Sequence, residues 1–162
     1  MNICRTAPRL VTTTPGDIYS LSLTPDASKL VFSAGTTQDG NLQRDVFSVN
    51  RDGSELRKLT DRPELSWQAA VSPDGSEIAY VVEQGGRSDL YAMNLDGSGD
   101  RRLTHSNAGY WEPLWAPEGK AILTTSRDTK GRNLELISVN SDGSGQQQIS
   151  QMGGGSNQYA AF

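Results

Sequence analysis

Two turn motifs recur through this chain at a nearly constant interval, and they constrain its fold more than any other feature. A Pro-Asp or Pro-Glu turn begins at Pro25, Pro73 and Pro117, which are 48 and 44 residues apart. An Asp-Gly-Ser turn begins at Asp52, Asp96 and Asp142, which are 44 and 46 residues apart. Because two separate landmarks keep the same period, the chain contains tandem copies of one structural unit.

The unit between residues 67 and 104 predicts four short antiparallel strands. Apolar or alternating runs are separated at each step by Gly, Pro, Asn or Asp, the residues that form hairpin turns. One four-stranded sheet has two faces that need cover, so it requires copies of itself. Four strands at a period of roughly 40 to 50 residues are typical of propeller blades. The sequence therefore predicts an all-β fold, a β-propeller.

Three full units are expected, over about residues 18–60, 67–104 and 111–150. An outer strand over 9–12 precedes them, an inner strand over 157–162 follows them, and residues 1–8 form a disordered N-terminal lead. In the first unit we expect residues 34–44 to be a long surface loop, because they are rich in Gly, Thr, Gln and Asn. Ala27 stands where the other turns have Gly75 and Gly119, so it either adopts the same positive φ or changes the turn.

Three blades span too little arc to close a ring, since propellers have roughly four to eight. Two interpretations remain open. The chain is a partial propeller, a portion of a longer one, or it is a short chain that closes the ring by self-association.

Composition excludes several classes of function. The chain has 162 residues, a net charge of −4 and a pI near 4.9, so it lacks the basic surface that nucleic acid requires. No apolar run is long enough for membrane insertion. The first residues lack the apolar stretch of a secretory signal, which fits a cytoplasmic protein or a segment of a longer exported chain.

The sequence offers little for catalysis, and we expect no enzyme activity. It has no Gly-x-Ser-x-Gly motif for a serine nucleophile, and its one histidine, His105, follows an outer strand in a loop. The one cysteine, Cys4, lies in the N-terminal lead. Segments 94–99 and 140–145 have oxygen-bearing residues at calcium-loop positions but lack the closing glutamate, so ordinary turns are favoured. We therefore predict no cofactor from the residues themselves.

Positions that vary between blades are the best candidates for binding. The innermost strands begin with Tyr19, Trp67, Trp111 and Gln158, and the next residues include Gln68, Glu112 and Tyr159. These strands surround the axis of a propeller, so aromatic and amide groups at their starts could grip a peptide or a sugar at one mouth of the channel. The alternative is that the tryptophans pack between blades. Arg127 follows a strand of the third unit and is either a surface charge or a partner contact.

The repeat resembles that of the TolB-like β-propeller family. The resemblance rests on Val71-Ser72-Pro73-Asp74-Gly75, on Asp89-Leu90-Tyr91, and on Asp96-Gly97-Ser98 followed by Arg102-Leu103-Thr104, and it covers about residues 9–162. It implies a bacterial, periplasmic scaffold that mediates protein-protein interaction or peptide binding, and a calcium-like cation in the channel. The same repeat is similar to that of propellers that gate prolyl-oligopeptidase-type hydrolases, and other propellers bind glycans or small ligands, so these functions remain alternatives.

Overall fold

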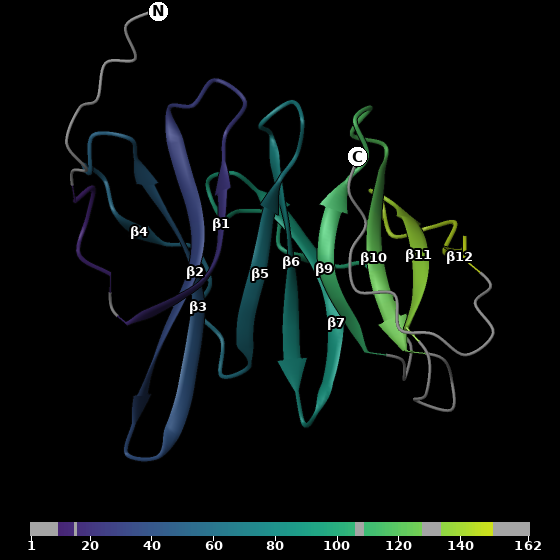
Figure 1. The fold of residues 1–162 in the computed structure, drawn as a ribbon, viewed down its shortest axis with the longest axis horizontal. Helices are drawn as coiled ribbons and strands as arrows, with labels where there is room; N and C mark the ends of the chain where they lie inside the picture. Colours follow the sequence, from purple (N-terminus) through teal and green to yellow (C-terminus); the bar gives the residue numbers. More distant parts are fainter. Residues whose placement is uncertain (1–9, 15, 106–108, 128–133, 151–162) are drawn as a thin grey trace, which may run out of the picture.

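The computed structural model describes residues 10–14, 16–105, 109–127 and 134–150. These residues form three antiparallel sheets of four strands each, which follow one another along the chain (Figure 1). Within them, no helix is long and apolar enough to cross a membrane. The predicted lead and the predicted inner strand over 157–162, with Gln158 and Tyr159, lie outside the described residues.

Each sheet is a meander in which strands that are neighbours along the chain also pair. The first blade contains β1 (Asp17–Leu23), β2 (Lys29–Gln38), β3 (Asn41–Asn50) and β4 (Arg57–Lys58). The second contains β5 (Leu65–Val71), β6 (Glu77–Gln84), β7 (Arg87–Asn94) and β8 (Arg101–Arg102). The third contains β9 (Tyr110–Trp115), β10 (Ala121–Arg127), β11 (Leu134–Asn140) and β12 (Gln147–Gln148). The three four-stranded blades that the repeat predicts are present.

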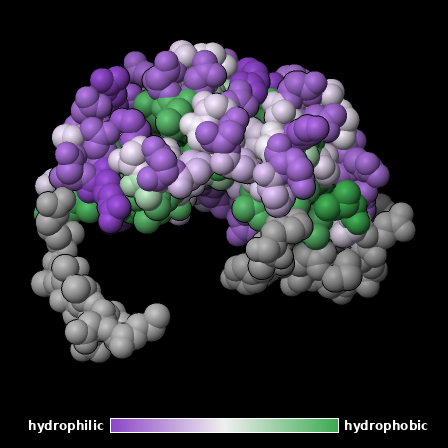
Figure 2. Space-filling model, turned by 90° about the horizontal axis from the view of Figure 1, so that it is seen from above, coloured by the Kyte–Doolittle hydropathy of each residue, from purple (hydrophilic) through white to green (hydrophobic). Residues whose placement is uncertain are grey.

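The three blades stand side by side as an arch (Figure 2). Their first strands are neighbours on the inner side: the backbone N–H groups of Ala69 and Val71 in β5 donate to the hydroxyls of Ser20 and Ser22 in β1, each at 3.0 Å. The sheets thus fan about an axis, and the all-β propeller fold is confirmed. The described blades form an open arc of such a propeller.

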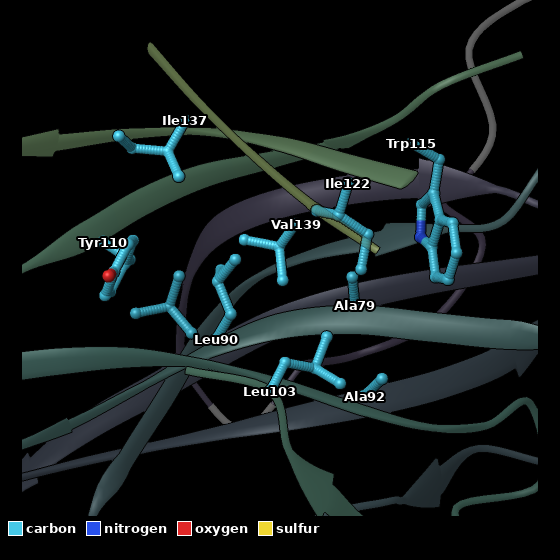
Figure 3. Close-up of a cluster of buried hydrophobic side chains, with 10 residues drawn as sticks. Ala79, Leu90, Ala92, Leu103, Tyr110, Trp115, Ile122, Ile137 and Val139 are labelled. Carbon is cyan, nitrogen blue, oxygen red and sulfur yellow. The ribbon is translucent and has the colours of Figure 1, made fainter. Parts of the chain in front are cut away.

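The second blade is buried on both faces because both sides of β6 are apolar. Successive side chains of a strand point to opposite faces. Ile78, Tyr80 and Val82 therefore pack in the core toward the first blade, whereas Ala79 and Val81 pack in the core toward the third. Figure 3 shows the second of these cores, in which Leu90 and Ala79 face Ile122 and Val139 across the blade boundary. Such burial is what one sheet alone could not provide.

The outermost strands are short, and a side-chain bond holds each chain segment that follows. Thr60 Oγ1 accepts from the Val46 N–H at 3.0 Å and donates to the Asp45 carboxylate at 2.8 Å. The second blade repeats this bond with Thr104, Leu90 and Asp89, and the third repeats it with Ser150, Leu136 and Glu135. The recurring hydroxyl residue at the end of each unit is therefore structural.

Residues 10–14 lie against the first blade as the outer edge of each blade lies against the next. A Cβ atom added to Gly53 would fall 2.0 Å from the carbonyl oxygen of Val11. The same contact recurs between Gly97 and the Leu59 oxygen, and between Gly143 and the Leu103 oxygen. An outer strand is predicted over residues 9–12; its described part, residues 10–12, is not a β-strand in the structure.

The turns follow the side-chain chemistry expected of them. Asp74 Oδ1 accepts from the Ser72 hydroxyl at 2.6 Å and from the Ser76 N–H at 3.0 Å, and these bonds lower the pKa of Asp74 to about 2. Asp26 makes the equivalent bonds with Thr24 and Ser28. These carboxylates are architectural. Ala27 has a φ of 55°, close to the values at Gly75 and Gly119, so it adopts the glycine conformation.

The prediction of a long loop over residues 34–44 is wrong. β2 continues to Gln38 and β3 begins at Asn41, so the segment is a regular hairpin with ten paired positions. Its two-residue turn consists of Asp39 and Gly40, both at positive φ (51° and 78°). Asp-Gly favours this turn because both of its residues tolerate positive φ. The twist of the turn matches the twist of the two strands that it joins. Here the turn chemistry outweighs the polar composition of the segment.

Candidate functional site

The inner strands β5 and β9 are irregular at the positions where the sequence places a binding site. Their pairing shifts after Trp67 and after Trp111, and the next residues, Gln68 and Glu112, have φ values of 51° and 55°. Residues with a Cβ adopt this left-handed conformation at a cost of about 1–2 kcal/mol. Bulges of this kind redirect side chains and cluster at functional sites.

The two bulges contact each other across the blade boundary. The Oε1 atom of Gln68 accepts a hydrogen bond from the backbone N–H of Glu112 at 3.1 Å. The Glu112 side chain itself is exposed. Two of the residues predicted from their repeat position therefore form one continuous surface.

A pocket of about 320 Å³ lies beside this surface. Its residues come from the inner strands of all three blades and from the open face of the third blade: Ser20, Gln68, Ala69, Glu112, Pro113, Leu114, Leu123, Thr124, Thr125 and Leu136. Proline and three leucines give it apolar walls, while Gln68 and Glu112 supply polar groups at one side. An apolar cavity with a few fixed polar groups is the usual form of a ligand site.

Tyr19 and Trp67 enclose an arginine that sequence reasoning missed. The guanidinium carbon of Arg44 lies 3.9 Å from the centroid of the Tyr19 ring and 5.0 Å from the Trp67 ring. Both distances are within the range of cation–π attraction. The polar composition of residues 34–44 predicts a surface loop, which would keep Arg44 away from the inner strands. The Asp-Gly turn at its centre was the available signal for a hairpin that carries Arg44 inward.

The buried polar atoms without partners gather at this place. Among the residues that the structure describes, three buried side-chain polar atoms have no hydrogen-bond partner: Arg44 Nε, Trp67 Nε1 and the hydroxyl of Ser66. Two belong to consecutive residues of β5, and the third belongs to the arginine that stacks on Trp67. Such groups are rare in folded proteins because each costs about 1–3 kcal/mol.

Among the other predicted residues, Arg127 and Trp111 contact each other, whereas Trp67 is partly buried between blades. The guanidinium carbon of Arg127 lies 5.7 Å from the centroid of the Trp111 ring, which joins two predicted residues. Trp67 packs partly against the core between the second and third blades, as the alternative interpretation expects. The tryptophan that anchors this boundary by hydrogen bonding is Trp115, whose Nε1 donates to the Ala70 oxygen at 3.0 Å. Whether the predicted residues bind a ligand stays a prediction.

Other groups that sequence analysis weighed lie elsewhere. His105 is exposed and lines a separate, more polar hollow with Asp89 and Arg102. In the segment 94–99, Asp96 accepts from the Ser98 backbone and hydroxyl, which lowers the Asp96 pKa and forms an ordinary turn. Within the described part of the chain, no three His, Cys, Asp or Glu residues are placed to hold a metal ion together.

Comparison with known proteins now identifies the family. Residues 41–161 match the family of the Tricorn protease N-terminal beta propeller domain. The chain belongs to this Tricorn N-terminal propeller family. A relative of the Tricorn-type propeller is dipeptidyl-peptidase 5 of Porphyromonas gingivalis, which is 30% identical over 71 residues, 43% of this chain and 10% of that protein.

Solved structures place the Tricorn-type blades in a wider group of folds. Putative TolB from Agrobacterium tumefaciens is 23% identical with a TM-score of 0.72, over 88% of this chain and 52% of that one. Oligogalacturonate lyase from Vibrio parahaemolyticus is 16% identical with a TM-score of 0.71, over 90% and 45%. A puromycin-hydrolyzing peptidase from Mycobacterium tuberculosis is 18% identical with a TM-score of 0.65, over 83% and 23%. The TolB-like propeller fold is thus shown, and the chain spans about half of these structures or less.

Proposed function

We propose that this propeller is a non-enzymatic scaffold that binds a peptide, or an extended segment of a partner protein, at the mouth formed by β1, β5 and β9. The observation that carries the proposal is the apolar pocket of about 320 Å³ beside two strained bulges. The left-handed backbone conformations of Gln68 and Glu112 are of a kind that clusters at functional surfaces. The neighbouring rings of Tyr19 and Trp67 add large contact areas at little cost in conformational entropy.

An extended peptide fits this pocket better than a flat surface of a partner protein would. Its walls are made by side chains such as Leu114 and Leu123, which accept an apolar side chain, and its polar edge is made by Gln68 and Glu112, which can bond to a peptide backbone. An extended segment could therefore place alternate residues in the pocket and along the bulges.

A titration with peptide tests the proposal. An equimolar mixture of random pentapeptides is added to the ¹⁵N-labelled chain, and amide shifts are followed by NMR. We expect shifts at residues 66–69 and 110–114. Leu114→Asp, which puts a charge into the pocket wall, should weaken binding at least tenfold. The matched control is Leu56→Asp, because Leu56 is 42% exposed and Leu114 is 37% exposed. Equal binding by both variants would refute the location.

A second candidate is an accessory propeller that gates a hydrolase domain. The similarity to dipeptidyl-peptidase 5 and to a puromycin-hydrolyzing peptidase supports it. It requires a Gly-x-Ser-x-Gly domain in the same longer chain or in a neighbouring gene. The same pocket would then guide peptides toward that domain. Glycan binding is a third candidate, which the fold shared with oligogalacturonate lyase supports.

A further inference from the structure

We infer that Arg44 binds a carboxylate of the peptide, so that the ligand is a peptide with a free C-terminus or an acidic side chain. The inference rests on the proposed function and names the chemical group that the site selects. It is carried by the position of Arg44, by its lack of an anionic partner and by its two stacked rings.

Arg44 reaches the inner side of the blade because its neighbour is glycine. In the ladder, Arg44 of β3 pairs with Gly35 of β2, which pairs with Asp17 of β1. A Cβ at Gly35 would fall 2.7 Å from Arg44 Cγ, so any larger residue would displace the side chain. The stem of Arg44 thus crosses β2 and sets the guanidinium over Tyr19.

No carboxylate forms an ion pair with Arg44 among the described residues. Its side chain has no hydrogen bond or ion pair among the described residues, and its Nε is buried. Other arginines are paired, as Arg101 is with Glu77 at 2.7 Å and Arg102 is with Asp89 at 2.7 Å. A partly buried guanidinium without an anion is unfavourable, so the site gains more from an incoming carboxylate than a solvated arginine would.

The fold does not require an arginine at this place. The ladder aligns Arg44 with Ser88 in the second blade and with Leu134 in the third. Ser88 uses its hydroxyl to accept from the Tyr110 N–H at 3.0 Å, a bond between blades that Arg44 does not make. The guanidinium is therefore a feature of one blade, which favours a ligand contact over a repeated structural need.

The geometry selects a carboxylate. The guanidinium carbon of Arg44 lies close to both the Tyr19 and the Trp67 ring, and such contacts limit the orientations that a planar guanidinium adopts. A carboxylate can take two parallel hydrogen bonds from such a fork, and charge-assisted bonds of this type are strong. The indole N–H of Trp67 is also buried and has no hydrogen-bond partner among the described residues. The apolar pocket beside Gln68 would take the side chain next to the carboxylate.

The test compares three pentapeptide mixtures that bind to the whole chain. All are acetylated; the first has free C-termini and no acidic residue, the second is amidated with no acidic residue, and the third is amidated with one aspartate. We expect the first or the third to bind at least tenfold more tightly than the second. The side-chain NMR signals of Arg44 should shift, because its guanidinium gains a partner. Arg44→Met should abolish the preference, and Arg44→Lys should restore only part of it.

Arg87→Met is the matched control, since it removes an exposed arginine from β7 and should leave the preference unchanged. Thermal unfolding of each variant checks that the fold persists. If all three mixtures bind equally and Arg44→Met has no effect, the carboxylate inference fails and the proposed function stands. If no peptide binds, the proposed function fails. Binding of trigalacturonate through Arg44 in place of peptides would overturn the peptide as the ligand.

Discussion

Thr104 Oγ1 donates to the carboxylate of Asp89 at 3.0 Å while it accepts from the backbone N–H of Leu90 at 3.0 Å. Thr104 is almost completely buried, so both bonds are shielded from water. Thr104→Val keeps the shape of the side chain and leaves the N–H group and the carboxylate without this partner. We expect a loss of about 2 kcal/mol in the free energy of unfolding, measured by urea denaturation. Thr104→Ser should retain most of the stability, since Ser150 makes the equivalent bonds in the third blade.

Ala27 adopts a conformation that favours glycine, and its replacement should stabilise the protein. Its φ of 55° matches the turns at Gly75 (76°) and Gly119 (68°). We expect Ala27→Gly to raise the free energy of unfolding by about 1 kcal/mol, because the strain of a Cβ at positive φ is removed. The reciprocal Gly75→Ala should lower it by a similar amount or more, since its Cβ would also approach Pro25 at 3.1 Å. A neutral or destabilising Ala27→Gly would contradict this account.

Tyr80 makes stability depend on alkaline pH. Its ring is wholly buried, and its hydroxyl donates to Asp100 at 2.5 Å. Burial raises the pKa of Tyr80 to about 12, above the usual value near 10. As the pH rises, Tyr80 loses its proton in the unfolded chain before it does so in the folded chain. Its contribution to the free energy of unfolding is therefore complete below pH 10 and is lost between pH 10 and 12. Denaturant titrations should show that the wild type loses about 2–3 kcal/mol more over this range than Tyr80→Phe does. If the wild type and Tyr80→Phe lose the same free energy of unfolding over this range, a group other than Tyr80 is responsible for the pH dependence.

Glu112→Gly should separate stability from binding. The substitution relieves a φ of 55° and removes an exposed side chain, so we expect the free energy of unfolding to rise by about 1 kcal/mol. Peptide affinity should fall, because the bulge becomes less rigid and its polar edge is lost. Asp39→Gly is the control: it relieves a similar φ of 51° at the tip of the first hairpin and should leave affinity unchanged. Calorimetric titration and thermal unfolding measure the two effects.

The strands were predictable from sequence because their turns carry their own chemistry. Pro73-Asp74 and Asp96-Gly97-Ser98 fix where strands end, and the repeat multiplies each weak signal by three. The hairpin around Asp39 and Gly40 differs from the predicted loop because the Asp-Gly dipeptide, and not the polar composition around it, decides the local structure. Arg44 was missed for a physical reason: its role depends on the pairing of Gly35 with two strands, which no local pattern reveals. The contact between the bulges at Gln68 and Glu112 likewise joins two blades, which no local pattern reveals.

The recurring contact between a turn glycine and the carbonyl of the preceding unit has an evolutionary consequence. Gly97 meets Leu59, and Gly143 meets Leu103, in the same way that Gly53 meets Val11. Each unit therefore has a turn glycine that packs on the unit before it and a carbonyl group on which the unit after it packs. A duplicated gene segment that encodes one unit would produce a blade that fits both of its neighbours. The chain could then lengthen by tandem duplication without a new contact surface between blades. The sequences of the copies could diverge at residues outside these contacts, such as Arg44.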